Sequence, residues 1–305
     1  MKTFDVIILG GGAAGLAAAT ALGRFRRSVL VIDAGAPRNA PADGVHNFLT
    51  RDGIDPLELQ RIGREQAGVY GVRFVDAEVT AVRPGFIVTA GETFTASRLV
   101  LATGVADELP DIPGLAERWG RDAIHCPYCH GWEVRDRKIG ILGTHEMVAH
   151  QAVMFRELSD DVTIYLDPAI TLSEDDLALF AARGIRLTHG SVASLDVRDD
   201  ALNSITLADG TRHAVEALAV ASRVSPRADM LAGLGLLPVE HPRGVGTHIP
   251  VDEFGQTSVP GVWAAGNVSD PMAQVVTSAA QGLMVGAAVN SDIIAEHNAA
   301  ALAHP

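Results

Sequence analysis

Cysteine is nearly absent from this chain of 305 residues, which contains only two, Cys126 and Cys129. So few thiols exclude a framework of structural disulfides and a zinc site with four thiolate ligands. A mixed site would have to recruit His125 or His130, which lie too close in sequence to complete a tetrahedron easily. The C-x-x-C spacing therefore predicts thiol–disulfide exchange, with two buried apolar cysteines or half of a metal site as the alternatives.

Long hydrophobic runs and positive charge are also scarce. No apolar run approaches the roughly 20 residues that a membrane-spanning helix needs. Lys and Arg number 24 against 37 Asp and Glu, and the resulting net charge of -13 argues against nucleic acid, since phosphate binding needs clustered cations. The N-terminus enters an apolar strand without an export signal. We therefore expect a cytoplasmic protein without membrane or nucleic-acid partners.

The first part of the chain has the pattern of a strand, a glycine turn, a helix and a second strand. Residues 5–9 are apolar and β-prone, residues 10–15 are glycine-rich, residues 16–22 are small and helical, and residues 28–32 form the next apolar run. Such a βαβ unit predicts a parallel sheet covered by helices. The length of the chain favours two domains.

The same order recurs in the middle of the chain. A strand at 138–142, a helix at 146–158 and a strand at 162–166 follow one another, and a further strand is predicted at 186–197. A long helix of small residues from about 273 to 295 completes the fold. The pattern predicts an α/β protein with two Rossmann-like domains, the second inserted into the first. The expected boundaries are 1–112 and 241–305 for the first domain and 113–240 for the central domain.

Two motifs carry chemistry directly. Gly10, Gly12 and Gly15 lie in a G-x-G-x-x-G turn between strand and helix, and Asp33 ends the next strand. The glycines let backbone N–H groups reach a pyrophosphate, while the carboxylate can accept hydrogen bonds from ribose hydroxyls. This motif predicts dinucleotide binding and does not distinguish FAD from NAD. In the second motif, the histidines on either side of the C-x-x-C sequence can move the protons that thiolate chemistry requires.

A third block, residues 261–267 followed by 274–280, indicates by itself only a buried strand, a glycine turn and a helix. Taken together, the three blocks resemble the low-molecular-weight thioredoxin reductase family of two-domain flavoproteins over essentially the whole chain. The resemblance implies an FAD-dependent enzyme that forms a homodimer, with both domains of the three-layer ββα type. It implies that these residues contact FAD: Gly10, Gly12, Ala13, Ala14, Gly15, Asp33, Ala34, Arg38, Asn47, Val79, Thr103, Gly104, Gly266, Asn267, Gln274 and Val275.

The resemblance also implies roles for the redox pair. Cys129 would face the flavin, and Cys126 would exchange with the substrate. His130 stands where reductases of the family have an acidic proton donor, and Asn267 replaces an aspartate that holds the ribityl chain. An asparagine keeps a hydrogen-bonding side chain but loses the charge, so it modifies the FAD contacts without abolishing them.

The central domain departs from the family pattern for NADPH. At the second glycine turn, His145 and Val148 replace small residues, and their Cβ atoms would obstruct a pyrophosphate. Asp167 stands where arginines would hold a 2′-phosphate. NADPH is therefore doubtful, and the chain, including its 45–53 block, resembles the NADPH-independent dithiol oxidase branch, which passes electrons through FAD to oxygen. The alternatives are an NAD(P)H-dependent thioredoxin-disulfide reductase and a non-catalytic flavin redox sensor. The expected partner is a dithiol or disulfide on a small metabolite, a peptide or a thioredoxin-like protein.

Overall fold

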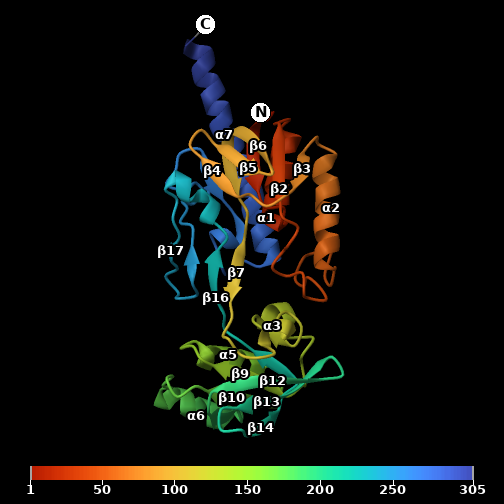
Figure 1. Ribbon diagram of the computed structural model, residues 1–305, viewed down its shortest axis with the longest axis vertical. Helices are drawn as coiled ribbons and strands as arrows, with labels where there is room; N and C mark the ends of the chain where they lie inside the picture. Colours follow the sequence, from red (N-terminus) through yellow and green to blue (C-terminus); the bar gives the residue numbers. More distant parts are fainter. Residues whose placement is uncertain (1, 304–305) are drawn as a thin grey trace.

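The structure is a computed structural model that describes residues 2–303. It contains two α/β units joined by a narrow connection (Figure 1). The N-terminal and C-terminal parts of the chain together form the upper unit in this view, and the middle of the chain forms the lower one. The predicted insertion of one Rossmann-like unit into another is confirmed.

The upper unit is built on a sheet with the strand order β3-β2-β1-β6-β5-β4, and β19 also pairs with β6. Its strands are β1 (Lys2–Leu9), β2 (Val29–Asp33), β3 (Arg73–Asp76), β4 (Ala81–Arg83), β5 (Ile87–Ala90), β6 (Glu92–Leu101) and β19 (Val262–Ala264). Strands β1, β2, β3, β6 and β19 run parallel, while β4 and β5 are antiparallel to their neighbours. The apolar run of β1 is buried from Val6 to Leu9, as a parallel strand covered on both faces requires.

Three helices accompany this sheet. They are α1 (Ala13–Arg24), α2 (Pro56–Gly68) and α7 (Val275–Ala303). Helices α1 and α7 pack with almost no space between their backbones, because a Cβ atom at Gly282 would lie 2.0 Å from the Ala14 carbonyl oxygen. This contact fixes the start of α7 beside the start of α1. The far end of α7 extends beyond the sheet (Figure 1).

The lower unit has a parallel sheet with the order β11-β10-β9-β15-β8. Its strands are β8 (Ala123–Ile124), β9 (Ile139–Gly143), β10 (Val162–Leu166), β11 (Arg186–His189) and β15 (Ala217–Ala219). Its helices are α3 (Leu115–Arg118), α4 (Pro127–His130), α5 (Val148–Arg156) and α6 (Glu174–Arg183). An antiparallel sheet of β12 (Val192–Arg198), β13 (Ala201–Leu207) and β14 (Arg212–Ala214) accompanies them.

The lower unit has three layers because the two faces of its parallel sheet are covered differently. Ile141 on β9 packs with Phe155 of α5 and Phe180 of α6. On the other face, Leu142 packs with Leu195 and Ile205 of the antiparallel sheet. This arrangement is the predicted ββα type.

The two units are connected by an antiparallel pair of strands, β7 (Val105–Glu108) and β16 (Arg223–Pro226). After β16 come η1 (Asp229–Leu234), β17 (Val239–Glu240), β18 (Thr247–His248) and η2 (Gly266–Val268). Leu231 and Leu236 are buried in the same core as the upper sheet. We therefore propose that the chain returns to the first domain at β16, earlier than the boundary expected at residue 240. Among the helices formed by residues 2–303, none has the length and apolar character of a membrane span.

Candidate active site

A pocket of about 1900 Å³ is lined by residues of both units. It exceeds the range of about 300–1,000 Å³ typical of small-ligand sites, so it has room for a large cofactor and a substrate. Of the residues predicted from the sequence, these line it: Gly10, Gly12, Ala13, Ala14, Asp33, Ala34, Arg38, Val79, Thr103, Gly104, Cys126, Cys129, His130, Gly266, Asn267, Gln274 and Val275. Gly15 and Asn47 do not.

The first glycine turn has the form of an anion site. Gly10 has φ +102°, and a Cβ atom there would lie 2.3 Å from the Ala102 carbonyl oxygen. Gly15 has a packing role, since its Cβ would meet the Gly10 carbonyl oxygen at 2.0 Å. Gly12 differs, because a Cβ on it would meet nothing within 4 Å. It precedes α1, whose first turn has neither a capping side chain nor an acidic residue, so its N–H groups can receive a phosphate.

Asp33 is held in place at the end of β2. Its carboxylate accepts hydrogen bonds from the Gly11 N–H at 3.0 Å and from the Gln60 side chain at 2.6 Å. Gln60 also donates to the Gly11 carbonyl oxygen at 3.1 Å. Because a carboxylate can accept about four hydrogen bonds, Asp33 retains capacity for a ribose hydroxyl. Sequence reasoning missed Gln60, which lies on α2 and carries no motif.

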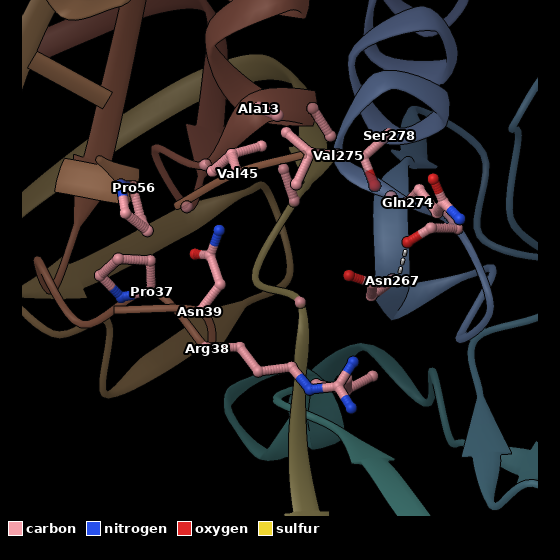
Figure 2. Close-up of a pocket in the computed structure, with 18 of the residues that line it drawn as sticks. Ala13, Pro37, Arg38, Asn39, Val45, Pro56, Asn267, Gln274, Val275 and Ser278 are labelled. Carbon is pink, nitrogen blue, oxygen red and sulfur yellow. Dashed lines mark hydrogen bonds between the residues drawn. The ribbon is translucent and has the colours of Figure 1, made fainter. Parts of the chain in front are cut away.

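The opposite wall of the pocket comes from the C-terminal part of the chain, where Asn267, Gln274 and Val275 face Val45 across the pocket (Figure 2). The Asn267 amide donates to the carbonyl oxygens of Asp270, Pro271 and Ala273 at 2.8–3.2 Å, which leaves its own oxygen free of these contacts.

A polar group on the pocket wall lacks a partner. The Thr103 hydroxyl is buried and has none among residues 2–303. A buried hydroxyl of this kind calls for a hydrogen-bonding ligand, and together with the open turn at Gly12 it fits FAD.

The redox pair lies at the start of the short helix α4. Pro127 occupies the first helical position, and the N–H groups of Cys129 and His130 both donate to the Cys126 carbonyl oxygen at 3.1 Å. A hydrogen bond from the Cys129 thiol lowers the pKa of Cys126 to about 7, despite burial, and the Tyr128 and Cys129 N–H groups and the Arg38 charge contribute. The same hydrogen bond and burial raise the pKa of Cys129. These shifts favour Cys126 over Cys129 as the position of negative charge in the reduced pair.

Two histidines accompany the thiols. Burial lowers the pKa of His130, whose Nε2 has no partner among residues 2–303. His125 also lines the pocket, and its Nδ1 lies 3.3 Å from the Val220 carbonyl oxygen. Burial and the Arg38 charge lower its pKa. Lowered pKa values keep both rings neutral near pH 7, so each can accept a proton.

Arg38 links the upper unit to the connection between the units. Its guanidinium donates to the Asp107 carboxylate on β7 at 2.7 and 2.5 Å, and Ser222 and Trp119 donate to the same carboxylate. Burial opposes ionisation of Asp107, but these donors outweigh it and hold its pKa below the usual value. The sequence indicated Arg38 as a cofactor contact and gave no sign of this ion pair.

The second glycine turn is occupied by a side chain of the protein itself, that of His145. His145 Nδ1 accepts the Met147 N–H at 3.2 Å, a group that an anion at the start of α5 would use. Val148 is buried in the core, so the prediction that its side chain obstructs this turn is wrong. The side chains that line the pocket here are those of His145 and Met147. Asp167 follows β10, and hydrogen bonds from the Ala169 N–H and the Ser191 hydroxyl lower its pKa. These residues do not fit a nicotinamide dinucleotide.

A metal has no comparable place. Within residues 2–303, no group of three or more His, Cys, Asp or Glu side chains is arranged to hold an ion.

Comparison with known proteins agrees with this description. The model of the pyridine nucleotide-disulphide oxidoreductase family matches residues 4–282. Thioredoxin reductase sirT of Leptosphaeria maculans is 32% identical over 309 residues, 94% of this chain and 93% of the relative. Thioredoxin reductase tcpT of Claviceps purpurea is 32% identical and covers 96% of this chain and 95% of its own.

Solved structures extend the comparison. The crystal structure of HlmI superposes with a TM-score of 0.90 at 42% identity and covers 98% of this chain and 95% of its own. An oxidoreductase from Agrobacterium tumefaciens gives a TM-score of 0.89 at 38% identity, with 96% of this chain and 99% of its own covered.

Fold, pocket and thiol pair together define an FAD-dependent disulfide oxidoreductase. The chain belongs to the pyridine nucleotide-disulphide oxidoreductase family and is similar to the low-molecular-weight thioredoxin reductases within it. The predicted family, fold class, enzyme class and flavin cofactor are thereby confirmed.

Proposed function

We propose that this enzyme oxidises a dithiol substrate to a disulfide through Cys126 and Cys129, with FAD as the electron acceptor of the pair and oxygen as the final acceptor. One observation carries the proposal. The thiols share a pocket with an open anion-binding turn at Gly12, whereas His145 fills the turn that a nicotinamide nucleotide would need. The resemblance also supports a cytoplasmic homodimer.

The thiol chemistry follows from the difference between the two sulfurs. In the oxidised pair, a substrate thiolate attacks Cys126, a new S–S bond forms, and Cys129 leaves as a thiolate. The second substrate thiolate then attacks the substrate sulfur of the mixed disulfide, the product disulfide forms, and Cys126 leaves. A thiol with a pKa of about 7 is a good leaving group, so Cys126 suits this second step. The substrate loses two electrons, and the cysteine pair gains them.

The surrounding groups prepare these steps. His130 is neutral, and its Nε2, which has no partner within residues 2–303, can take the proton of a substrate thiol as it becomes a thiolate. Arg38 stabilises the thiolate that leaves, because its charge favours ionisation of both cysteines. Bound FAD supplies a two-electron acceptor for the reduced pair.

A thioredoxin-disulfide reductase driven by NAD(P)H is the second candidate, because the fungal relatives bear the name thioredoxin reductase. In that function a small metabolite, a peptide or a thioredoxin-like protein would be the disulfide that is reduced. The filled turn at His145 is the observation that weighs against it.

Anaerobic titration of the yellow holoenzyme separates the two functions. We expect stoichiometric dithiothreitol to bleach the flavin, stoichiometric NADPH to leave it oxidised, and air to restore the colour with formation of peroxide. The variant Cys126→Ser should lose dithiol-driven oxygen uptake while keeping its bound flavin. Prompt bleaching by NADPH would refute the oxidase.

A further inference from the structure

A closed loop of the upper unit, residues 45–54, lies against α4 (Pro127–His130) of the lower unit, called the redox helix below. The loop is closed at its base, since the Val45 N–H donates to the Ile54 carbonyl oxygen and the Gly53 N–H donates to the Val45 carbonyl oxygen, each at 2.8 Å. Asn47 has φ 60°, in the left-handed region that a residue with a side chain seldom adopts. Asp52 supports this conformation by accepting the Asn47 N–H at 2.8 Å. The loop therefore presents Asn47 in one defined orientation.

One side chain of the loop reaches α4, and a second reaches the segment that follows it. The Asn47 amide donates to the Tyr128 carbonyl oxygen at 2.8 Å. His46 lies beside it, with Nε2 3.4 Å from a Glu133 carboxylate oxygen and Nδ1 3.5 Å from an Asp52 oxygen. Carbonyl groups of a helix of only four residues lack a following turn to bind them, so the Tyr128 oxygen needs such a donor.

The contacted oxygen belongs to the peptide unit that also carries the Cys129 N–H. That N–H points toward Cys126, where it donates to the carbonyl oxygen at 3.1 Å and also favours the thiolate. The C=O and N–H of one peptide point in opposite directions and polarise each other. A donor on the Tyr128 oxygen therefore strengthens the N–H that faces Cys126.

We propose that Asn47 is a positioning residue for the redox pair: its amide orients and polarises the Tyr128–Cys129 peptide so that the Cys129 N–H stabilises negative charge on Cys126. This inference rests on the role of Cys126 as the exchanging thiol in the proposed function. This role takes the place of the expected cofactor contact, since the Asn47 side chain binds the Tyr128 carbonyl oxygen of α4 and Asn47 does not line the pocket.

Alkylation kinetics test the inference without turnover. In a Cys129→Ser background, Cys126 is the single thiol, and its rate of reaction with iodoacetamide against pH gives its ionisation midpoint. Asn47→Gly is the informative variant, because glycine accepts the left-handed backbone and removes only the amide. Loss of one hydrogen bond predicts alkylation about three- to tenfold slower at pH 7. The midpoint should rise, while the limiting rate at high pH should not fall, because a thiolate of higher pKa is the stronger nucleophile.

Leu49→Ala is the matched control, since this side chain lies on the same loop, is 85% exposed and does not line the pocket. It should reproduce the parent profile. A second variant, Asn47→Asp, places a carboxylate against the Tyr128 oxygen and should shift the midpoint at least as far as glycine does. An Asn47→Gly profile that coincides with that of Leu49→Ala would overturn the inference. Because flavin and oxygen take no part in alkylation, failure of the oxidase function alone would leave this result unaffected.

Discussion

The two glycine turns of the molecule occupy equivalent places in two similar βαβ units, yet they are built for different purposes. At the first turn, Gly12 opens onto the pocket and the N–H groups at the start of α1 lack a capping side chain. At the second, a Cβ atom on Gly143 would meet the Tyr165 carbonyl oxygen at 2.8 Å, and His145 binds the N–H of Met147. A glycine after a strand therefore marks close backbone packing in both units, but an anion site in only one.

The charged side chains near the two turns also differ, with a cation near the first turn and a carboxylate near the second. Arg38 lines the pocket on the side of the first unit, whereas Asp167 follows β10 in the second. Hydrogen bonds from the Ala169 N–H and Ser191 keep the Asp167 carboxylate ionised. The second unit has thus kept the fold of a nucleotide-binding domain, while its turn has become a wall of the pocket that contains the C-x-x-C pair.

The largest effect is expected from a negative charge at the first turn. Gly12→Asp has space for its side chain, so the protein should fold, but the new carboxylate would face the pyrophosphate. Juxtaposed like charges cost several kcal/mol, so flavin affinity should fall by about 100-fold or more. Flavin absorbance and a fluorescence titration of the apoprotein measure this. Thr144→Asp adds the same charge at an exposed position of the second turn and should leave flavin binding intact. Equal losses in both variants would break the comparison.

The next largest effect concerns the cation of the first unit. Arg38→Ala leaves the buried Asp107 carboxylate with only Ser222 and Trp119 as donors. Removing one partner of a buried pair should destabilise the holoprotein by about 3 kcal/mol in denaturant unfolding at pH 7. The paired carboxylate has a lowered pKa, so its contribution is present above its unfolded pKa and lost as pH falls. The deficit should therefore persist down to about pH 4 and shrink only below it, as pH falls through the lowered pKa. Arg38→Lys, which keeps the charge, should lose less.

How far the sequence predicts this molecule depends on the range of the interactions involved. The strand before Gly10 and the acid at Asp33 form a local pattern, and both lie where that pattern places them. The strand predicted at 186–197 is divided in the structure, because Gly190 at φ +145° separates β11 from β12. The helix predicted at 273–295 continues to Ala303, since small helix-forming residues follow without a stop signal.

Contacts between distant segments lie beyond such patterns. Arg38 and Asp107 are 69 positions apart, and Asn47 and Tyr128 are 81 apart. Nothing in the residue types alone pairs them, because each polar side chain has many possible partners until the fold is formed. Sequence reasoning could therefore name most residues of the pocket wall, whereas the long-range partners of Arg38 and Asn47 required the structure.

A smaller effect concerns the ionisation of the reduced pair. With a pKa of about 7, Cys126 should be about half ionised at neutral pH, against about 1% for a thiol at 9.0. Thiolate absorbance of the reduced protein should therefore rise about tenfold between pH 6 and pH 8. Arg38→Ala should move this rise to higher pH, since the Arg38 charge favours the thiolate. A midpoint near 9 in the parent protein would contradict the assignment of Cys126 as the ionised thiol.

The smallest effect is expected from reopening the second turn. In His145→Gly with Asp167→Arg, the Met147 N–H is released and a cation replaces the carboxylate where a 2′-phosphate would lie. Calorimetric titration of the holoprotein with NADPH should show affinity about fivefold higher than in the parent, because a partly exposed ion pair adds up to about 1 kcal/mol. Asp167→Asn alone removes only the repulsion and should gain less. If the parent already binds NADPH tightly and the double variant changes nothing, the filled turn does not exclude the nucleotide, and the contrast between the two turns lies only in their packing.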